Sequence, residues 1–579
     1  MAQTADEIVA VGDRFEMATG GRSSPISLKS HGTNKGDATT EDSTAQVVAV
    51  GRGGADAGLE AMGYTPQLKR NRGQLEIQGM LMSLFAVPFG ISSGFYTALI
   101  GGGPVSLIWG FILVGFFQEC VAVSLGEIHS CLPTSGGPYY WSHCLAPRRF
   151  KHALSYTTGW LYLLAIWMLD LGTHYGTVIL IFGAVNIWYP DYVAPAWVLL
   201  VATYGLYLLS TVVCWKLDDY VPMLDKINAV WTGIGLIVIT TTLLATHQLG
   251  FRSASFVFTN YDWSFSGWGQ GFTFFIGLLP GCFVMCGVGF ITSMSEEVAV
   301  PTKQASPIPR AMVMGIPLAV ISGLVMILGC LFTLPDVATL LAAPGGTPVP
   351  VILSTVTGSQ TGGTVGLIFV KSDLCLMYED SPLYRDFKRR DRLVGISYVM
   401  QRPADGNSVA NQFVSSRTTW AFSRDDALPL SSLWASVDNN SQPRNALFVS
   451  TLVQMLVTLL SLGSSSAFNA FLNVGIIGVD LSYGLPIFIS LLDRRRTVSS
   501  APYNMGWIGV GCNVITTAWV AFSLVLFCMP IAIPVTATSA NYAPAVLAFF
   551  MGFSGLWFAL RARKTYRGPP ANLNLEEHH

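Results

Sequence analysis

The sequence Ala-Val-Pro-Phe-Gly-Ile-Ser-Ser-Gly at residues 86–94 lies inside an apolar segment that runs from 77 to 100. Pro88 removes a backbone donor, Gly90 loosens the helix, and two serine hydroxyls follow directly. A helix in a bilayer hides its backbone groups, so an interruption exposes amides to an anionic group and carbonyls to a cation. The stretch therefore predicts a polar site in the middle of a membrane.

A second stretch of the same kind lies in the sixth apolar segment, where Pro280-Gly281 is followed by Cys286-Gly287-Val288-Gly289. Two broken helices five spans apart are what an inverted repeat of five plus five spans predicts. Glycine and proline are also common in ordinary membrane helices, so each break taken singly favours a packing role. The two breaks in corresponding positions favour a solute site.

Composition places the chain in the membrane class. Of its 579 residues, 51% are hydrophobic and 12% are charged, whereas a soluble domain carries about 25% charged residues. This excludes an ordinary cytosolic enzyme and predicts an all-α integral membrane protein. The net charge of −1 gives no indication of a nucleic-acid partner. The ten cysteines show no regular spacing, so neither a disulfide framework nor a metal site is expected.

Apolar runs of about 20 residues, each long enough to cross ~30 Å of hydrocarbon as a helix, recur along the chain. Basic residues gather in alternate loops. Every loop obeys the positive-inside rule only if the chain crosses the membrane twelve times, with both ends cytosolic. The expected spans are 77–100, 104–128, 156–181, 193–213, 221–246, 268–293, 311–334, 446–464, 467–491, 505–529 and 543–561, with a twelfth inside 350–370.

Three segments lie outside this pattern. Residues 1–76 are rich in Gly, Ser, Thr, Asp and Lys, which predicts a disordered cytosolic tail, and 563–579 form a second tail. Residues 370–414 are charged and loop-like, too polar to enter a bilayer, although the charge rule requires a crossing there. The transporter core would comprise 77–369 and 415–562, with its eighth span disrupted.

Ionisable residues inside the spans are the second sign of function, namely Glu119, Asp170, His174 and Asp480. His174 lies four residues after Asp170, so the two share a helix face. Such groups could hold a substrate ammonium or carry a coupling proton. All four are therefore candidates for proton coupling, and Asp170 is also a candidate substrate ligand. The alternative is a neutral or paired carboxyl that locks two helices together.

The loop motifs resemble those of the amino acid–polyamine–organocation superfamily. EIHSCLPTSGG at 127–137 is similar to the exit of its second span, and MSEE at 294–297 is similar to the segment after its broken sixth helix. SRTTWAFSRDDALP at 416–429 resembles the loop after its eighth helix. SAFNA at 466–470 and PVTATSANYA at 534–543 narrow the resemblance to the fungal amino acid/choline transporter branch.

The resemblance covers about 60–369 and 415–568, and it implies a secondary transporter with a five-plus-five inverted repeat and two further helices. Substrate would lie between the broken first and sixth helices, with the third, eighth and tenth as walls. A choline-like cation would rely on aromatic rings such as those of Phe89 and Phe283. Many relatives have an acidic residue at the position where this chain has Gly289, so the chain departs from the family pattern there. The implied substrate-binding residues are Val87, Pro88, Phe89, Gly90, Ser92, Ser93, Asp170, Phe283, Cys286, Gly287 and Gly289.

The expected function is import of an amino acid, GABA or a choline-like amine across the plasma membrane by proton symport and alternating access, without a cofactor. One alternative is a nutrient receptor that does not transport. Another is an inactive product of a mis-spliced permease gene, because relatives carry an apolar helix where 370–414 stands. A membrane-embedded enzyme is disfavoured, because the sequence contains no metal-ligand cluster and no GxSxG motif.

Overall fold

The computed structural model describes residues 59–570 except 61, 248–249, 299–306, 344–345, 371–405, 439–440, 464–466 and 537–539. The predicted N-terminal tail up to residue 58, the stretch 371–405 of the polar insert and the end of the second tail from 571 lie outside the described residues. The described end of the N-terminal tail is not disordered as expected, because Met62, Tyr64 and Arg72 are buried against the helices. Within the described part, the secondary structure is helical apart from two isolated β-bridges.

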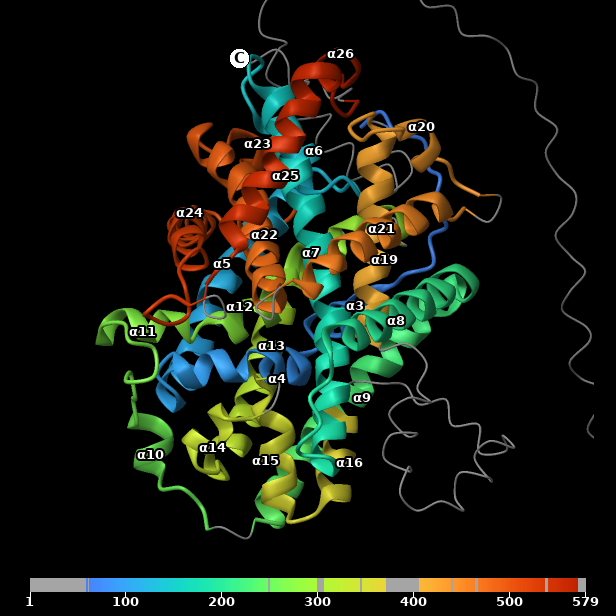
Figure 1. The fold of residues 1–579 in the computed structure, drawn as a ribbon. Coiled ribbons are helices and arrows are strands. Elements are labelled where there is room, and N and C mark those ends of the chain that lie inside the picture. Colours follow the sequence, from blue (N-terminus) through green and yellow to red (C-terminus); the bar gives the residue numbers. More distant parts are fainter. Residues whose placement is uncertain are drawn as a thin grey trace, which may run out of the picture. The chain divides into compact units, whose positions relative to one another are not determined.

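Eleven helices in the described part of the chain are long and apolar enough to cross a membrane, and they confirm the eleven predicted spans (Figure 1). The first five are α3 (Gln74–Phe85) with α4 (Val87–Ile100), η1 (Ser106–Gly110) with α5 (Phe111–Cys131), α7 (Lys151–Trp188), α8 (Ala196–Lys216), and η2 (Asp218–Tyr220) with α9 (Val221–Ala245). The other six are α11 (Gln270–Ile276) with α12 (Leu279–Met285) and η3 (Cys286–Glu297), α13 (Pro307–Phe332), α21 (Arg444–Thr458) with η5 (Leu459–Leu462), α22 (Ala467–Leu492), α24 (Trp507–Leu526), and α25 (Ala543–Trp557) with η6 (Phe558–Ala562) and α26 (Arg563–Thr565).

Short helices join these spans. They are α6 (Pro138–Leu145), α10 (Ala254–Thr259), α14 (Val337–Leu341), α20 (Ser431–Trp434) and α23 (Arg496–Ser499).

The expected span within 350–370 is not one helix. Two short helices, α15 (Pro348–Thr357) and α16 (Gln360–Val370), pack against each other there. The reason is Gly358, which adopts the left-handed conformation with φ 60° and ends α15. Neither α15 nor the described part of α16 has the ~20 residues that a membrane crossing requires, so the described residues do not show the single span expected at 350–370.

A polar helix, α19 (Gly406–Arg424), lies in the interval where the charge pattern requires a further crossing. It begins inside the stretch assigned to the polar insert, so residues 406–414 are helical and not loop-like. Its residues 407–423 are all buried, because α7, α8, α21, α3 and η3 pack around it. A polar helix is tolerated at membrane depth when protein, and not lipid, surrounds it.

The spans form two sets of neighbours. The broken helices α4 and α12 pack on each other and on α13, and α12 also packs on α5. In the second set, α7, α8, α19 and α21 pack together, and α22 lies along α7 on the side away from α19 (Figure 1). The candidate site therefore has one wall of interrupted helices and one wall of continuous helices.

Candidate functional site

The first span is interrupted at Ala86, which adopts the left-handed conformation with φ 36° and ψ 55° between α3 and α4. The sequence places this break at 87–93, but those residues are helical. The physical reason is that Pro88 stands in the first turn of α4. The N–H groups of a first turn make no hydrogen bond within the helix, so the N–H group that proline lacks is not missed there. The proline thus starts the second half-helix, and the strain falls on the residue before that half-helix.

The two predicted serine ligands are engaged within α4. The hydroxyl of Ser92 donates to the carbonyl of Pro88 at 2.7 Å, and the hydroxyl of Ser93 donates to the carbonyl of Gly90 at 3.0 Å. These bonds occupy carbonyls near the start of the half-helix.

The sixth span is broken twice. Its α-helical part resumes at α12 with Pro280 in the first turn, and at Cys286 the backbone tightens into a 3₁₀-helix that continues to Glu297. This confirms a broken sixth helix at Cys286-Gly287-Val288-Gly289. A 3₁₀-helix has poorer hydrogen-bond geometry than an α-helix, and long stretches of it are uncommon. Cys286 also donates its thiol hydrogen to the carbonyl of Phe283 at 3.4 Å.

The two interrupted spans cross at glycines. A Cβ atom on Gly94 would lie 2.7 Å from Cγ of Pro280, and a Cβ on Gly90 would collide with the side chain of Val284. Close backbone approach at small residues four apart is typical of packed membrane helices. Phe89 and Phe283 meet at this crossing edge to face, with their ring centroids 6.1 Å apart.

Two tyrosines that the sequence analysis missed surround Gly289. Tyr162 of α7 donates its hydroxyl to the carbonyl of Gly289 at 3.4 Å, and its ring lies 6.0 Å from that of Tyr483 on α22. A Cβ on Gly289 would lie 2.6 Å from the Tyr483 ring. Tyr483 thus fills the space that a larger side chain would need. Tyr483 lies three residues after Asp480, so the two side chains share a helix face. This spacing could have identified Tyr483 from the sequence.

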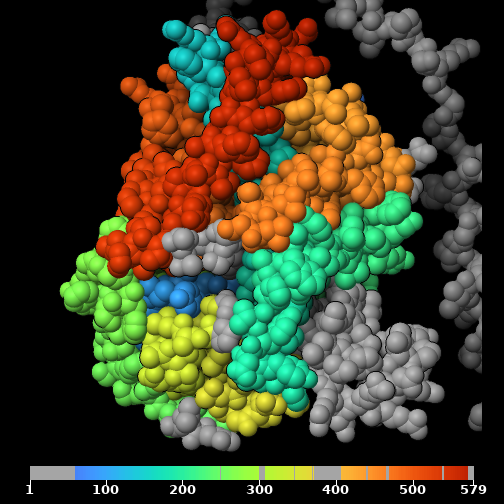
Figure 2. Space-filling model, in the orientation of Figure 1, coloured from blue at the N-terminus to red at the C-terminus, as the bar shows by residue number. Residues whose placement is uncertain are grey.

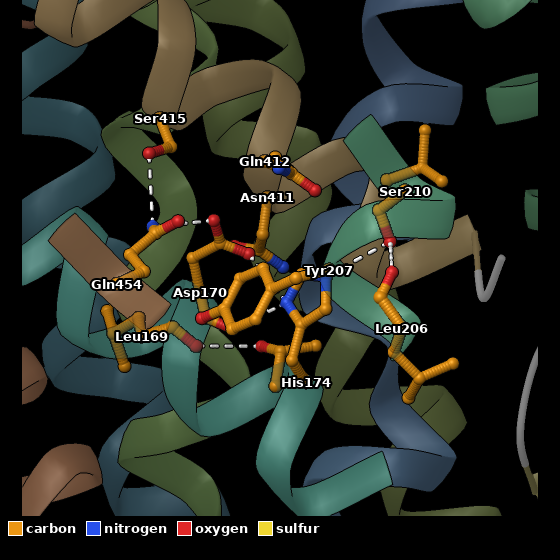
Figure 3. A network of polar contacts seen from close by, with 12 residues as sticks. Leu169, Asp170, His174, Leu206, Tyr207, Ser210, Asn411, Gln412, Ser415 and Gln454 are labelled. Atoms are coloured by element: carbon orange, nitrogen blue, oxygen red, sulfur yellow. Dashed lines mark hydrogen bonds and ion pairs between the residues drawn. The ribbon is translucent and has the colours of Figure 1, made fainter. Parts of the chain in front are cut away.

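Asp170 lies at the centre of a buried polar network on α7 (Figure 3). Its Oδ2 accepts a hydrogen bond of 2.7 Å from the side-chain amide of Gln454, and its Oδ1 lies 3.0 Å from Nδ1 of His174. The other ring nitrogen of His174 lies 3.1 Å from the hydroxyl of Ser210, and the imidazole stacks on Tyr207 at 4.0 Å. The predicted pairing of Asp170 with His174 is thus present in the structure.

The network joins four spans of the second set. Gln454 of α21 also donates to the hydroxyl of Ser415 on α19 at 3.2 Å. One helical turn away, the amide of Gln412 donates to Thr211 of α8 at 2.7 Å and to Thr451 of α21 at 2.6 Å. In the described part of the chain, the polar contacts of Asp170 run to these helices and not to α4 or α12. Such a buried carboxyl beside an imidazole can hold a proton.

The remaining ionisable candidates lie apart from this network. Asp480 of α22 accepts a hydrogen bond of 2.6 Å from Ser523 of α24 and is close enough to Cys286 to interact electrostatically. Asp480 therefore lies near the broken sixth span. Glu119 of α5 interacts instead with Cys512 of α24. It therefore lies where α5 meets α24, beside the small cluster that contains Cys512.

Five charged residues form a buried ion-pair cluster beside the first and sixth spans. The carboxylate of Glu297, at the end of η3, accepts from Nε of Arg72 at 3.1 Å and from Nε of Arg417 at 2.9 Å. Arg72 also pairs with Asp225 at 3.3 Å, and Arg417 pairs with Asp218 at 2.8 Å. We call these residues the five-residue ion-pair cluster. It ties the start of α3 and the end of η3 to α19 and to the α8–α9 turn.

A second buried group lies beside this cluster. Asp425, just after α19, accepts from the hydroxyls of Tyr64 at 3.0 Å and of Tyr139 at 2.8 Å. Burial raises the pKa of Asp425 to about 6, although the neighbouring Arg424 guanidinium opposes this rise. Arg424 in turn pairs with Glu296 at 3.0 Å. The family motifs carried the signal for these contacts. One motif contains two acids and the other contains two arginines, so their charges are complementary, namely Glu296, Glu297, Arg417 and Arg424.

Comparison with known proteins agrees with this architecture. The sequence profile of the amino acid permease family matches residues 79–565. The chain is 30% identical to the rice homolog of amino-acid permease BAT1, over 90% of this chain and 97% of that protein. It is 27% identical to a choline transporter of Saccharomyces cerevisiae, over 83% and 79% of the two chains. The same yeast's polyamine transporter TPO5 is 27% identical, over 83% and 74%. The chain is therefore a multi-pass membrane protein that belongs to the amino acid permease family.

Proposed function

We propose that the protein moves a small amine-bearing solute across a membrane by alternating access, with the solute bound where the broken spans cross. The observation that carries this proposal is the contact of α4 with α12 at Gly90 and Gly94, next to the interruptions at Ala86 and Cys286. Because α4 and α12 pack on each other beside these interruptions, the free backbone groups of both spans could act on one solute.

The first half-site supplies donors. The opening N–H groups of α4 have no partner inside the helix, and the helix dipole places positive potential there. A solute carboxylate would bind these amides, beginning with that of Val87. The carbonyl groups at the end of α3 would face a solute ammonium.

The aromatic pair Phe89 and Phe283 extends the choice of solute to quaternary amines. Their edge-to-face arrangement leaves ring faces that can stabilise a cation without a carboxylate partner. Relatives named as amino-acid permease, polyamine transporter and choline transporter support an amine as the shared feature of the solute.

We assign proton coupling to Asp170 with His174, and to Asp480. Asp170 contacts Gln454 of α21 and His174 of α7, and these two side chains continue the network to Ser415 of α19 and Ser210 of α8, which favours a relay role over direct contact with the solute. A change in its protonation would act on the helices that face the broken spans. Asp480 lies nearer to η3, where a proton could respond directly to the solute.

The cationic loops support an orientation in which both termini are cytosolic, in the plasma membrane. In that orientation the five-residue ion-pair cluster lies on the cytosolic side. The cluster is buried and its ion pairs are intact, which supports assigning the structure to a conformation closed on that side. Inward release of solute would require these ion pairs to separate.

Uptake of labelled amino acids, GABA, choline and spermidine into proteoliposomes tests the proposal, with and without an imposed pH gradient. Accumulation that a protonophore abolishes supports proton-coupled transport. Saturable binding of one of these amines without flux would instead favour a receptor, and the absence of both binding and flux would refute the proposal. A tag at either terminus that a membrane-impermeant protease reaches from outside cells would overturn the orientation.

A further inference from the structure

The segment that follows the last span turns back onto the start of α7. The hydroxyl of Tyr566 lies 2.8 Å from that of Ser155, and its ring packs against Tyr156 with centroids 5.4 Å apart. Gly568 lies against the imidazoles of His143 and His152, so closely that a Cβ there would contact both. Residues about 400 positions apart in the sequence are thereby held side by side.

This contact assembles a cluster of cations from two segments. Figure 2 shows the start of α7 with α6, in cyan, beside the end of α25 with α26, in red. The α6–α7 loop and the α7 start contribute three cations, and the last span and its extension contribute four. We call them the basic patch, which consists of Arg148, Arg149, Lys151, Arg561, Arg563, Lys564 and Arg567.

The four cations of the C-terminal segment are exposed, and none pairs with a carboxylate in the described part of the chain. Arginines elsewhere behave differently: Arg72, Arg417 and Arg495 each have a carboxylate partner within 3.1 Å. Like charges held close together repel each other, so these four cations favour a multivalent anion from outside the protein.

The patch lies next to aromatic side chains at the ends of two spans. Arg561 lies over the ring of Trp557 in the last span, 5.8 Å from the centroid, and Arg149 lies 5.4 Å from the centroid of Phe150. Phe150 is 52% exposed although it is a large apolar residue. Aromatic side chains next to cations at the end of a span are typical of the level of lipid headgroups.

We propose that the basic patch binds the headgroups of anionic phospholipids in the cytosolic leaflet. Clusters of four to eight Lys and Arg beside a span attract such headgroups, and Phe150 and Trp557 hold the patch at that depth. The positive-inside rule would place cations in each segment separately, but it does not require the two segments to be joined by Tyr566. The joined patch offers one surface for a polyanionic headgroup.

The test uses the full-length protein purified in detergent, and measures binding of phosphatidylinositol 4,5-bisphosphate, phosphatidylserine and phosphatidylcholine in mixed micelles. The patch variant is Arg563→Gln with Lys564→Gln. The matched control is Arg494→Gln with Arg496→Gln, which removes two exposed cations from another loop that also carries Asp493. Soluble inositol trisphosphate and inorganic phosphate are tested in parallel.

The two anionic lipids should bind, the zwitterionic lipid should not, and salt should weaken the binding. Loss of two surface cations should weaken it by about 30-fold in the patch variant, while the control binds like the wild type. Equal losses in both variants would overturn the proposal, as would equal binding of all three lipids. Soluble inositol trisphosphate that binds as tightly as the lipid would also overturn it, because the ligand would then not be a membrane lipid.

Discussion

Replacement of Glu297 by Gln should loosen the closed end of the site. Glu297 is 5% exposed and receives hydrogen bonds from Arg72 and Arg417, which are 0% and 3% exposed. Removing one partner of a buried ion pair costs about 3–5 kcal/mol, because the remaining charge is left without compensation. Each arginine keeps a second carboxylate, Asp225 or Asp218, so we expect the lower end of this range, about 3 kcal/mol.

That loss acts on the closed conformation. When the cluster separates, its side chains become solvated and Glu297 contributes little, so the substitution shifts the balance toward opening by about 100-fold. The assay is the rate at which a cytosolic thiol reagent modifies Cys286, measured in a variant that retains no other cysteine. Cys286 is 2% exposed in the closed structure, so labelling reports opening.

The control is Lys69→Gln, which breaks the exposed Lys69–Asp219 pair in the same region. Exposed ion pairs contribute about 0–1 kcal/mol, so this variant should be labelled like the parent protein. Glu297→Asp keeps the charge and should recover part of the protection. If Glu297→Gln and Lys69→Gln label at the same rate, the cluster does not hold the site closed and the argument fails.

Three further predictions concern other parts of the fold. Asp170→Asn keeps an acceptor for Gln454 but loses the charge. It should therefore abolish uptake driven by a pH gradient and preserve solute exchange. Gradient-driven uptake at the wild-type rate would contradict the relay role. Gly94→Ala should lower the free energy of unfolding by about 1–3 kcal/mol through overpacking against Pro280, and the thermal midpoint should fall with it, whereas Gly205→Ala, with open space around it, should change neither. For Asp425, the folded pKa of about 6 lies above its unfolded value, so the protonated carboxyl stabilises the fold below about pH 4 and this contribution disappears as the pH rises to 6. Asp425→Asn should therefore flatten the change of the unfolding midpoint between pH 4 and 6, and an unchanged slope would refute this assignment.

Local chemistry was sufficient to predict eleven spans and the presence of a break in the first and in the sixth. A run of about 20 apolar residues has few alternatives to a membrane helix. A proline with nearby glycines, in corresponding spans of two repeats, predicts that both helices are interrupted. The position of the first break was predicted less well, because Pro88 is compatible with the first turn of a helix and the distortion falls on Ala86. Sequence spacing alone does not distinguish a proline that ends a helix from one that starts it.

Contacts between distant segments could not be predicted. Gln454 and Asp170 lie on different spans, and nothing in either local sequence selects the other as a partner. Residues 406–414 of α19 were taken for part of a loop because hydropathy measures compatibility with lipid, while this helix is surrounded by protein. Gly358 divides the 350–370 segment through a left-handed turn, which an apolar count does not register.

The enclosed, polar character of α19 has a consequence for biosynthesis. A helix that carries Arg417 and Arg424 costs about 2.5–3.5 kcal/mol per arginine to place in the bilayer centre, so α19 will not leave the translocon for lipid on its own. Its partner Gln454 belongs to a span synthesised later. We therefore expect α19 to need a protected place until α21 has been made, so that maturation of the protein would depend on the order in which these two helices emerge.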